Sequence, residues 1–265
     1  MAFNFNNIVT GKVKKPKIGL LYGLPGLGKT TALSKLPDVL IIPVEEGANE
    51  IDVAKMNFGT QEAPRFKANS FQEVIDTLQL GTQDGFPFKN IVIDSVSELE
   101  LLIHKEVCLT NNVSSIEKID YGKGYKFAME QWLKLFAAIE YLRNNCNIGV
   151  WMIAHSDTQR FNDPEGEPYD YYAPQLRKEP MEYISKNVDA IFFLTKKKAI
   201  RKVDIGFNQK ESKAVDMNQR VLYTSQKVTH VAKNRAQPSL PEEIPLDMNL
   251  ALDMYDNPEK YQQQV

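Results

Sequence analysis

The stretch Ile18–Thr31, IGLLYGLPGLGKTT, decides the fold of this chain. It begins with an apolar run typical of a buried strand, continues through a glycine-rich turn and ends where a helix can start. The turn fits the pattern G-x-x-x-x-G-K-[ST] through Gly23, Gly28, Lys29 and Thr30. Glycines let successive backbone N–H groups point inward, while the helix N-terminus and the lysine add positive charge. We therefore expect this turn to hold a polyphosphate.

The motif predicts ATP as the ligand and Mg²⁺ as its counter-ion. The Lys29 ammonium would neutralise the terminal phosphates, and the Thr30 hydroxyl would bind the Mg²⁺ that bridges them. A glycine-rich turn without a ligand is the alternative interpretation. The residues expected to surround the phosphates are Gly23, Leu24, Pro25, Gly26, Leu27, Gly28, Lys29, Thr30 and Thr31.

A pair of carboxylates follows the next predicted strand. The apolar run Val39–Val44 (VLIIPV) ends directly at Glu45 and Glu46. Ligands bind beyond the carboxyl ends of the strands in open α/β sheets. One of these glutamates is therefore a candidate to orient and deprotonate the water that attacks the γ-phosphate. A solvated acidic turn is the alternative.

Two later strands also end in polar side chains. The run Ile91–Ile93 closes on Asp94, which is a Walker B pattern, and we expect Asp94 and Thr30 to hold the Mg²⁺ with its water shell. The run Ile148–Ala154 closes on His155. We expect His155 to contact the γ-phosphate or the attacking water and to report hydrolysis; a structural histidine is the alternative.

Two segments combine aromatic with basic residues, a composition that suits single-stranded DNA because bases stack on aromatic rings. YGKGY at 121–125 is predicted to be a mobile loop, or else a turn before the next helix. The segment 156–180 is predicted to be long and irregular, and its acidic residues weaken the case for DNA. The candidate DNA contacts are Lys123, Tyr125, Arg160, Phe161, Arg177 and Lys178.

The segment from 188 to 235 predicts a strand and a β-hairpin extension, followed by basic residues at the end of the last strand. The run KKKAIRK at 196–202 indicates a solvated hairpin face, with a binding patch as the alternative. Lys233, Asn234 and Arg235 follow directly after a predicted strand. Cations held at a strand end near the edge of a sheet can reach a neighbouring subunit's nucleotide as an arginine finger.

Composition sets limits on the class of protein. The 265 residues carry a formal net charge of -2, so the chain does not bind nucleic acid through bulk charge. Cys108 and Cys146 are far apart in the sequence, which favours a reducing cytosol over a disulfide framework or a zinc site. No apolar stretch reaches the length of about 18 residues that a membrane span needs, and no leader pattern is present. We therefore expect a cytoplasmic protein with no membrane partner.

The chain divides into three predicted parts: an N-terminal arm at 1–17, an ATPase domain at 18–235 and a C-terminal tail at 236–265. The arm contains Phe3 and Phe5 among asparagines, followed by KVKKPK. It either lies on its own domain or docks onto a neighbouring subunit. The last residues of the tail, EKYQQQV, are expected to be loose.

Four landmarks in order, the loop with GKT and the strands with VEEG, IVIDS and IAH, resemble the RecA-type branch of P-loop ATPases over 15–235. More narrowly, VEEGANEIDV, IVIDSVSELE, YGKGY, IAHSDTQRFNDPEGEPYDYY and RVLYTSQKVTHVAKNR are similar to phage nucleotide-binding ATPases that include RecA-like single-strand annealing proteins. The resemblance implies an α/β fold with a mostly parallel central sheet flanked by helices. It also implies that one strand separates the loop strand from the Walker B strand, and that oligomers hold ATP at their interfaces.

The resemblance assigns roles position by position. Glu45 matches the catalytic glutamate, with Glu46 where a second acid often stands. Asp94 matches the Walker B aspartate, and His155 matches the sensor. Lys233, Asn234 and Arg235 resemble the KNR of RadA-type ATPases, whose basic residues act on the neighbouring subunit's nucleotide. The chain lacks the extended C-terminal domain of bacterial RecA and a close copy of its DNA loops, so strand exchange does not follow.

The expected function is that of a RecA-like ATPase in the cytoplasm of a phage-infected bacterium. It would form a ring or filament of identical subunits and act on single-stranded DNA in recombination, annealing or replication, together with phage or host proteins of those processes. A first alternative is a nucleotide-switched scaffold or accessory protein that binds a protein partner. A small-molecule kinase is disfavoured, because no lid with clustered arginines follows the core.

Overall fold

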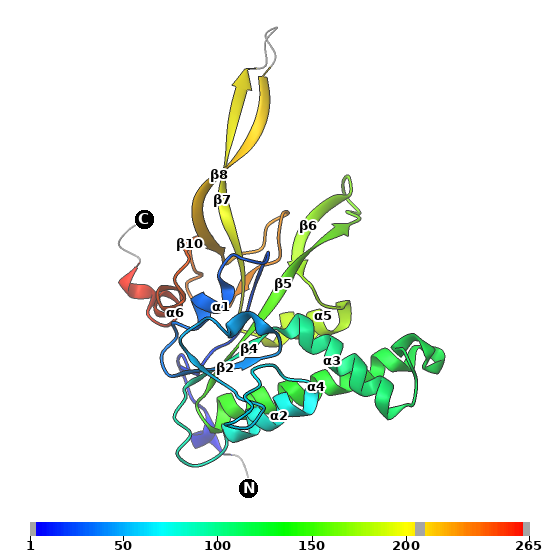
Figure 1. The fold of residues 1–265 in the computed structure, drawn as a ribbon. Helices are drawn as coiled ribbons and strands as arrows, with labels where there is room; N and C mark the ends of the chain where they lie inside the picture. Colours follow the sequence, from blue (N-terminus) through cyan, green and yellow to red (C-terminus); the bar gives the residue numbers. More distant parts are fainter. Residues whose placement is uncertain (1–3, 205–209, 262–265) are drawn as a thin grey trace.

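A single mixed sheet forms the centre of the molecule in the computed structural model, which describes residues 4–204 and 210–261 (Figure 1). Within that part of the chain the sheet has ten strands, eight of them in the order β10-β8-β7-β1-β5-β4-β2-β3, with β6 paired to β5 and β9 paired to β7. The strands are β1 (Ile18–Gly23), β2 (Val39–Pro43), β3 (Ala54–Lys55), β4 (Asn90–Asp94), β5 (Gly149–Phe161), β6 (Tyr169–Pro174), β7 (Ala190–Asp204), β8 (Lys210–Tyr223), β9 (Lys233–Asn234) and β10 (Glu243–Pro245).

Neighbours in the part of the sheet with the order β7-β1-β5-β4-β2-β3 are all parallel, and β5 separates the loop strand β1 from β4. This confirms the predicted RecA-like P-loop core with a mostly parallel sheet. Because the strands are parallel, their carboxyl ends share one edge of the sheet. We call this edge, where Gly23 and Asp94 lie, the carboxyl edge, and the opposite edge, where the parallel strands begin, the amino edge.

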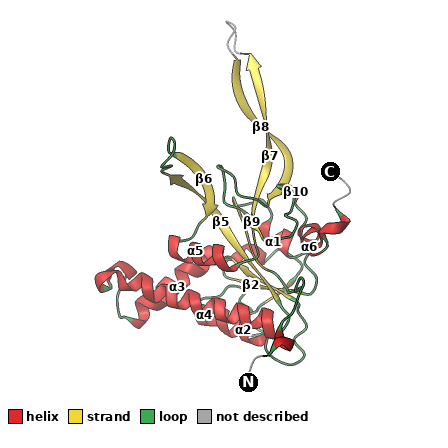
Figure 2. Ribbon diagram, turned by 180° about the vertical axis from the view of Figure 1, so that it is seen from behind, coloured by secondary structure: helices red, strands yellow, loops and turns green. Residues whose placement is uncertain are grey.

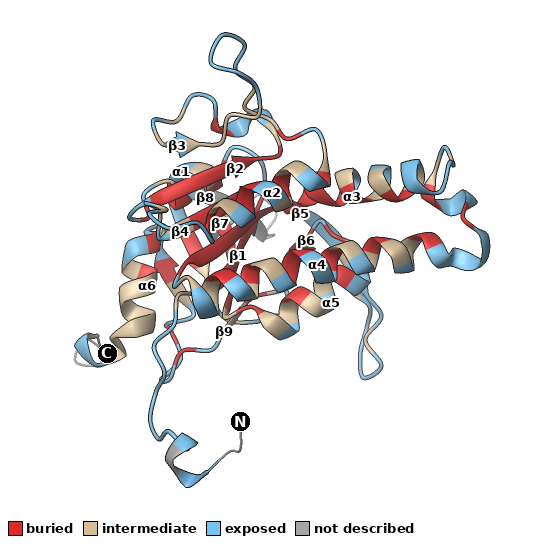
Figure 3. Ribbon diagram, turned by 90° about the horizontal axis from the view of Figure 1, so that it is seen from below, coloured by how far each residue is buried: buried red, intermediate tan, exposed pale blue. Residues whose placement is uncertain are grey.

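Helices cover both faces of the sheet. Their bounds are α1 (Lys29–Leu33), α2 (Phe71–Leu80), α3 (Val96–Thr110), α4 (Lys123–Asn145), α5 (Lys178–Asn187) and α6 (Met248–Asp256). Side chains of successive β1 residues point to opposite faces of the sheet. Leu20 and Tyr22 pack in the core with α2 to α5, whereas Leu21 packs with α1 and α6. Figure 3 shows the buried residues along the strands and on the inward sides of the helices.

Two β-hairpins project from the carboxyl edge (Figures 1 and 2). The hairpin of β7 and β8 is the extension that the sequence predicts. The hairpin of β5 and β6 corrects the expectation of an irregular segment at 156–180, because β5 continues to Phe161 and β6 returns antiparallel to it. Aromatic neighbours on these strands, such as Phe161 and Tyr169 with ring centroids 5.4 Å apart, favour strand pairing.

Of the two interpretations of YGKGY, the structure shows the turn before a helix and not a loop. Tyr121 and Gly122 adopt left-handed conformations with φ of 55° and 66°, and α4 begins at Lys123. Only the first two residues therefore form a turn. Lys123 and Tyr125 lie in the first turn of α4.

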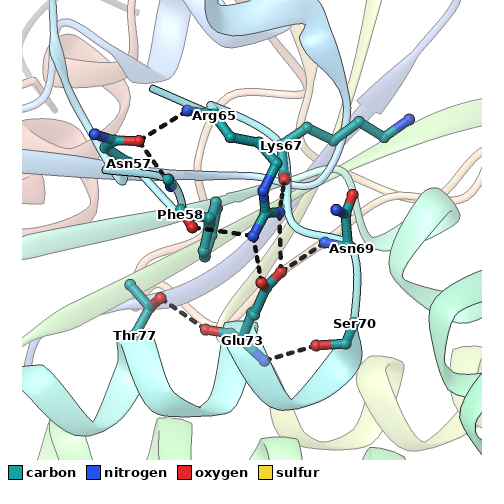
Figure 4. Close-up of polar contacts among 9 residues, drawn as sticks. Asn57, Phe58, Arg65, Lys67, Asn69, Ser70, Glu73 and Thr77 are labelled. Atoms are coloured by element: carbon teal, nitrogen blue, oxygen red, sulfur yellow. Dashed lines mark hydrogen bonds and ion pairs between the residues drawn. The ribbon is translucent and has the colours of Figure 1, made fainter. Parts of the chain in front are cut away.

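The segment between β3 and α2 is held by a compact polar network centred on Arg65 and Glu73 (Figure 4). The Arg65 guanidinium lies 2.5 Å from one Glu73 carboxylate oxygen and 3.2 Å from the other. The Glu73 carboxylate also accepts a hydrogen bond from the Asn69 N–H, while the Ser70 hydroxyl caps α2 by accepting the Glu73 N–H. This network fixes the loop that precedes α2.

Residues 236–261 pack against the ATPase core. β10 pairs with β8, and Leu240, Ile244 and Met248 are buried in the core beneath α1. Residues 262–265, the end of the stretch that the sequence predicts to be loose, lie outside the described residues, as does Phe3 of the arm. Among the helices of the described residues, none combines the length and the apolar character needed to cross a bilayer.

Candidate nucleotide site

The loop between β1 and α1 has a backbone that requires its glycines. Gly26 and Gly28 have φ of 77° and 87°, in the left-handed region that favours glycine. A Cβ on Gly23 would lie 2.3 Å from the Leu194 carbonyl oxygen, which would force the two strands apart. Leu24, Pro25 and Gly26 are exposed, so the outer side of the loop faces solvent.

Lys29 lies inside this loop and is only 7% exposed. Its Nζ donates hydrogen bonds to the carbonyl oxygens of Gly23 at 2.9 Å and Leu24 at 3.1 Å. Burial lowers the pKa of Lys29, while the nearby carboxylates of Asp94 and Glu45 act in the opposite direction. The ammonium is thus bound by neutral carbonyl oxygens, which a phosphate, as an anionic and stronger acceptor, can replace.

Thr30 and Asp94 meet beside the loop. The Thr30 hydroxyl donates a 2.7 Å hydrogen bond to Oδ2 of Asp94. Burial is the main reason that the pKa of Asp94 is raised to about 6. Its other oxygen, Oδ1, is buried and has no hydrogen-bond partner among the described residues.

This oxygen pair fits a Mg²⁺ ion. An unpartnered buried carboxylate oxygen beside a hydroxyl supplies the hard oxygen donors that Mg²⁺ prefers, and the ion usually takes its remaining ligands from phosphates and water. The described residues contain no group of three or more His, Cys, Asp or Glu side chains that could hold a metal by themselves. The donors therefore suit an ion that arrives with a nucleotide.

Glu45 and His155 form the second polar pair at the carboxyl edge. The His155 Nε2 lies 3.0 Å from the Glu45 Oε2. The hydrogen bond from His155 is the main cause of the lowered pKa of Glu45, and the same bond is the main cause of the raised pKa of His155. The hydrogen bond therefore favours the charged form of each side chain, carboxylate for Glu45 and imidazolium for His155. Glu46 is exposed and begins the short 3-10 turn Glu46–Ala48 that follows.

Strand register brings these groups together. His155 is the β5 partner of Gly23 in β1, and Asp94 is the β4 partner of Pro43 at the end of β2. Lys29, Thr30, Glu45, Asp94 and His155 consequently converge at one place, although they span more than 120 residues of sequence. The arrangement combines a glycine-rich loop, a hydroxyl–carboxylate pair and a carboxylate that is hydrogen-bonded to an imidazole.

Comparison with protein families decides the classification. The model of the AAA domain family matches residues 15–236, which is most of the chain. The chain belongs to the AAA domain family. This AAA-domain protein is a nucleotide-binding P-loop ATPase, and its strand order is that of the RecA-like core.

Other comparisons add less. No curated protein matches the sequence. Among solved structures, the AAA-domain protein is similar to the RadB recombinase, with 15% sequence identity over 79% of this chain and 80% of that chain, and a TM-score of 0.38.

Two contacts of the site could not be read from the sequence. Arg220, on β8 of the projecting hairpin, donates from Nη1 to the Leu27 carbonyl oxygen at 3.1 Å. Ser97, in the first turn of α3, accepts a hydrogen bond from the His155 N–H at 3.1 Å and donates to the Gln175 carbonyl at 3.0 Å. The AAA-domain protein thus connects both hairpins to the nucleotide site. No spacing in the sequence signals either contact, because both depend on strand order.

Lys233 and Arg235 lie away from their own chain's nucleotide site. β9 pairs with the beginning of β7, where Ile191 faces Lys233, so this strand lies at the amino edge. Lys233 Nζ donates to the carbonyls of Ser185 and, at 3.0 Å, of Val188, while Arg235 donates to the Lys186 carbonyl. Both cations therefore cap the carboxyl end of α5. Arg235 is the more exposed of the two.

The structure divides the candidate DNA residues into two groups. Arg160 and Phe161 lie near the end of β5 in its projecting hairpin. Tyr125 and Arg177 instead form a packed pair, with the guanidinium carbon 3.5 Å from the ring centroid. Lys123 lies in the first turn of α4, and Lys178 is an exposed residue at the start of α5 that lies 3.9 Å from Glu182.

Proposed function

We propose that this protein hydrolyses ATP at the carboxyl edge of its sheet while it acts on single-stranded DNA in recombination, annealing or replication. The observation that carries the proposal is the convergence of the Glu45–His155 pair and the Thr30–Asp94 pair on the phosphate loop. The RecA-like strand order supports it. The resemblance to phage annealing ATPases supports action in an infected bacterial cytoplasm, with phage or host replication and recombination proteins as partners.

The chain's own groups suit the binding of a triphosphate. Backbone N–H groups of residues 23–31, other than Pro25, would surround the phosphates, and Lys29 would exchange its two carbonyl acceptors for phosphate oxygens. Thr30 and Asp94 would hold the Mg²⁺, which neutralises phosphate charge and orients the terminal phosphate when bound.

Glu45 is the proposed general base. Its lowered pKa keeps the carboxylate ionised at neutral pH, and the hydrogen bond from His155 fixes its direction. The water oxygen attacks the γ-phosphorus as its proton passes to Glu45, and the bond from the γ-phosphorus to the bridging oxygen breaks to leave ADP and phosphate. Glu46 is exposed in the next turn and is proposed only as a secondary acid of the site.

His155 and Ser97 are proposed to report the nucleotide state to the β5–β6 hairpin. Ser97 bridges the His155 N–H and the Gln175 carbonyl, and Gln175 N–H bonds back to the His155 carbonyl at 2.8 Å. A change at the Glu45–His155 pair therefore reaches the strand that ends at Pro174 through only two hydrogen bonds. Arg160 and Phe161 in this hairpin are the proposed DNA contacts.

The remaining candidates take lesser parts in the proposal. Tyr125 and Arg177 stack on one another. This contact occupies the ring face and the guanidinium that would otherwise contact a base. Lys123 and Lys178 are exposed and can contribute charge near a DNA backbone. We therefore propose that the hairpin residues, rather than the α4 residues, make the main contacts.

The subunit interface is proposed to complete the active site. Arg235 lies at the amino edge, so it can reach a nucleotide only in a second copy of the chain that stacks its carboxyl edge there. Lys233 is less suited, because its ammonium is committed to two carbonyls and its pKa is lowered by burial. Such head-to-tail contact produces a ring or a filament.

The decisive experiment compares ATP hydrolysis by the full chain with and without a long single-stranded oligonucleotide, with duplex DNA of equal length as the control. We expect the rate to rise severalfold with the single strand and to depend on protein concentration. A mixture of Lys29→Ala and Arg235→Ala subunits should recover part of the activity that each lacks alone. A rate indifferent to DNA, with no recovery in the mixture, would contradict the proposal.

A nucleotide-switched scaffold is the second candidate, and one observation favours it. The α3–α4 helical pair extends from the body (Figure 3), and its outer end exposes Leu109 and Tyr121, at 68% and 93%. Exposed apolar side chains of this kind suit a protein partner. The scaffold hypothesis is favoured if the rate of ATP hydrolysis is slow, does not change when DNA is added and changes when a protein partner binds.

A further inference from the structure

A cavity of about 380 Å³ lies at the amino edge of the sheet, away from the phosphate loop. Its wall joins the N-terminal arm at 12–17, Arg143 of α4, and Asp189 just before β7. Arg235 after β9 and Tyr255 of α6 complete it. Five separate parts of the chain therefore build one cavity.

Positive charge dominates this cavity. Its lining has six cationic side chains and two carboxylates, among the residues the structure describes; the cations are Lys12, Lys14, Lys15, Lys17, Arg143 and Arg235. Lys17 pairs with Asp256 at 2.7 Å, and Arg143 lies 3.4 Å from Asp189. The other four cations have no carboxylate partner in the described chain.

Those four cations are bound by neutral oxygens. Lys12 donates to the Gln237 carbonyl at 2.5 Å, Lys14 to Asn257 Oδ1 at 3.3 Å, Lys15 to Asn144 Oδ1 at 2.8 Å and Arg235 to the Lys186 carbonyl. Carbonyl and amide oxygens orient an ammonium without cancelling its charge. Like charges gathered in this way repel one another, so the cavity is suited to an anion that would relieve the repulsion.

Arg143 points most directly to a ligand. Its side chain is 17% exposed, and its only described ion pair is the long contact with Asp189, whose Oδ2 also accepts the Ile18 N–H at 2.9 Å. The Arg143 Nε is buried and has no hydrogen-bond partner within the described residues. A guanidinium has five N–H donors and binds phosphate oxygens in a fork. Arg143, which lines the cavity, thus has one donor that no described residue satisfies.

We propose that this cavity binds the oligophosphate of a nucleotide, with Arg143 and Arg235 as fork donors and the arm lysines as the surrounding charge. The cations enclose one compact cavity, which suits a triphosphate better than an extended DNA backbone that needs a track of cations. The nucleotide is either free or held in the phosphate loop of a second copy. Only the second source rests on the proposed function, through the role of Arg235 between subunits.

The test uses sodium tripolyphosphate as the probe and titration calorimetry on the full-length Lys29→Ala variant, whose phosphate loop is weakened. We expect binding to persist in this background. Arg143→Gln should then weaken it about tenfold or more, as expected for the loss of charge-assisted hydrogen bonds. Lys105→Gln on α3, an exposed lysine outside the cavity, is the matched control and should leave the affinity unchanged.

A second variant guards against misfolding, because Arg143 contacts Asp189 in the body. Lys14→Glu with Lys15→Glu changes only the exposed arm and should weaken tripolyphosphate binding at least as strongly. If the Arg143→Gln chain and the arm variant both bound tripolyphosphate as tightly as their Lys29→Ala parent, or if Lys29→Ala alone lost all binding, the proposal would be overturned. So would displacement of tripolyphosphate by a single-stranded oligonucleotide at equal phosphate concentration, because that assigns the cavity to DNA.

Two further measurements separate the sources. Equilibrium dialysis of ATP against dilute wild-type chain should give two nucleotides per chain if the free nucleotide is the ligand, and one if a second copy supplies it. In the latter case the arm variant should lose the concentration dependence of ATP hydrolysis; a single nucleotide with unchanged concentration dependence contradicts both. If single-stranded DNA did not stimulate ATP hydrolysis, the proposed function would be contradicted, but the conclusion from tripolyphosphate binding would still hold.

Discussion

The two edges of the sheet handle charge in opposite ways. At the carboxyl edge, the two carboxylates have specific side-chain partners: the half-buried Glu45 pairs with His155, and the buried Asp94 accepts from the Thr30 hydroxyl. At the amino edge, four of the six cavity cations bind only neutral oxygens in the described chain. Groups paired in this way are held in fixed directions, as chemistry requires. Unpaired cations favour binding of an anion from outside.

This difference follows from how the sheet is built. A parallel sheet presents all its strand ends at one edge, so loops there place a few side chains with precision. The amino edge has no such convergence, and its charges come from the arm, α4, α6 and the segment after β9. These elements line a cavity and do not converge on a single group of side chains. The two edges therefore differ in how they arrange their charges.

The largest expected effect comes from removing the buried cation of the carboxyl edge. Lys29→Ala should lower the rate of ATP hydrolysis by roughly 10²–10³, because it removes the charge that meets the developing charge on the phosphates. The control is Lys35→Ala, an exposed lysine just beyond α1, which should retain activity. Steady-state hydrolysis assays measure both. Comparable loss in both variants would contradict the role of the loop.

Breaking the Glu45–His155 pair should separate hydrolysis from binding. Glu45→Gln should lower hydrolysis by about 10²–10³ and leave ATP affinity nearly unchanged, because the amide cannot take a proton. Single-turnover hydrolysis and fluorescent-nucleotide titration measure the two quantities. An equal loss in both would assign Glu45 to binding.

The same pair predicts a pH dependence of folding stability. The pKa of His155 is raised from 6.5, so its contribution is full below 6.5 and is lost as pH rises through the higher folded value. The pKa of Glu45 is lowered from 4.5, so its contribution is full above 4.5 and is lost as pH falls through the lower folded value. The pair therefore stabilises most between pH 4.5 and 6.5. In urea unfolding, the free energy of unfolding of Glu45→Gln should vary less with pH than that of wild type, both below 4.5 and above 6.5.

A smaller effect is expected from Arg220, which ties the β7–β8 hairpin to the carboxyl edge. Arg220→Ala removes its hydrogen bond to the Leu27 carbonyl and should raise the KM for ATP by about tenfold or less. The adjacent exposed residue, in the variant Gln219→Ala, is the control. If the two variants have the same KM, the hairpin does not support the loop.

The smallest effect on activity concerns Glu100, a buried carboxylate of α3 that accepts the Arg177 N–H at 3.2 Å. Burial raises its pKa from 4.5 to about 7, so the folded chain holds a proton that the unfolded chain releases, and stability falls as pH rises between these values. Glu100→Gln should remove this dependence and stabilise the protein at pH 8 by up to about 3 kcal/mol.

Urea unfolding at low and high pH measures this change, with Glu98→Gln on the same helix as the control. ATP hydrolysis should stay within about twofold of wild type, since surface and scaffold changes away from the site leave the chemistry intact. Equal stability of wild type and Glu100→Gln at pH 8 would show that the carboxylate is better solvated than its burial implies.

Much of the fold and the carboxyl edge could be predicted because the signals are local. The glycine pattern with Lys29, and the apolar runs that end in Glu45, Asp94 and His155, are each contained in about ten residues. Parallel strands then bring these ends to one edge. Local patterns failed at 156–180, where strand pairing between β5 and β6 turned an irregular composition into a hairpin.

The sequence by itself determined the phosphate loop, the succession of buried strands and the acidic and histidine side chains at their ends, because each follows from hydrophobic period and backbone conformation over a few neighbouring residues. Only the tertiary structure decided that Arg220 reaches Leu27, that Ser97 joins His155 to Gln175 and that six cations surround one cavity. These contacts join residues distant in the chain. Their formation depends on strand order and helix packing, for which no short stretch of sequence carries a signal.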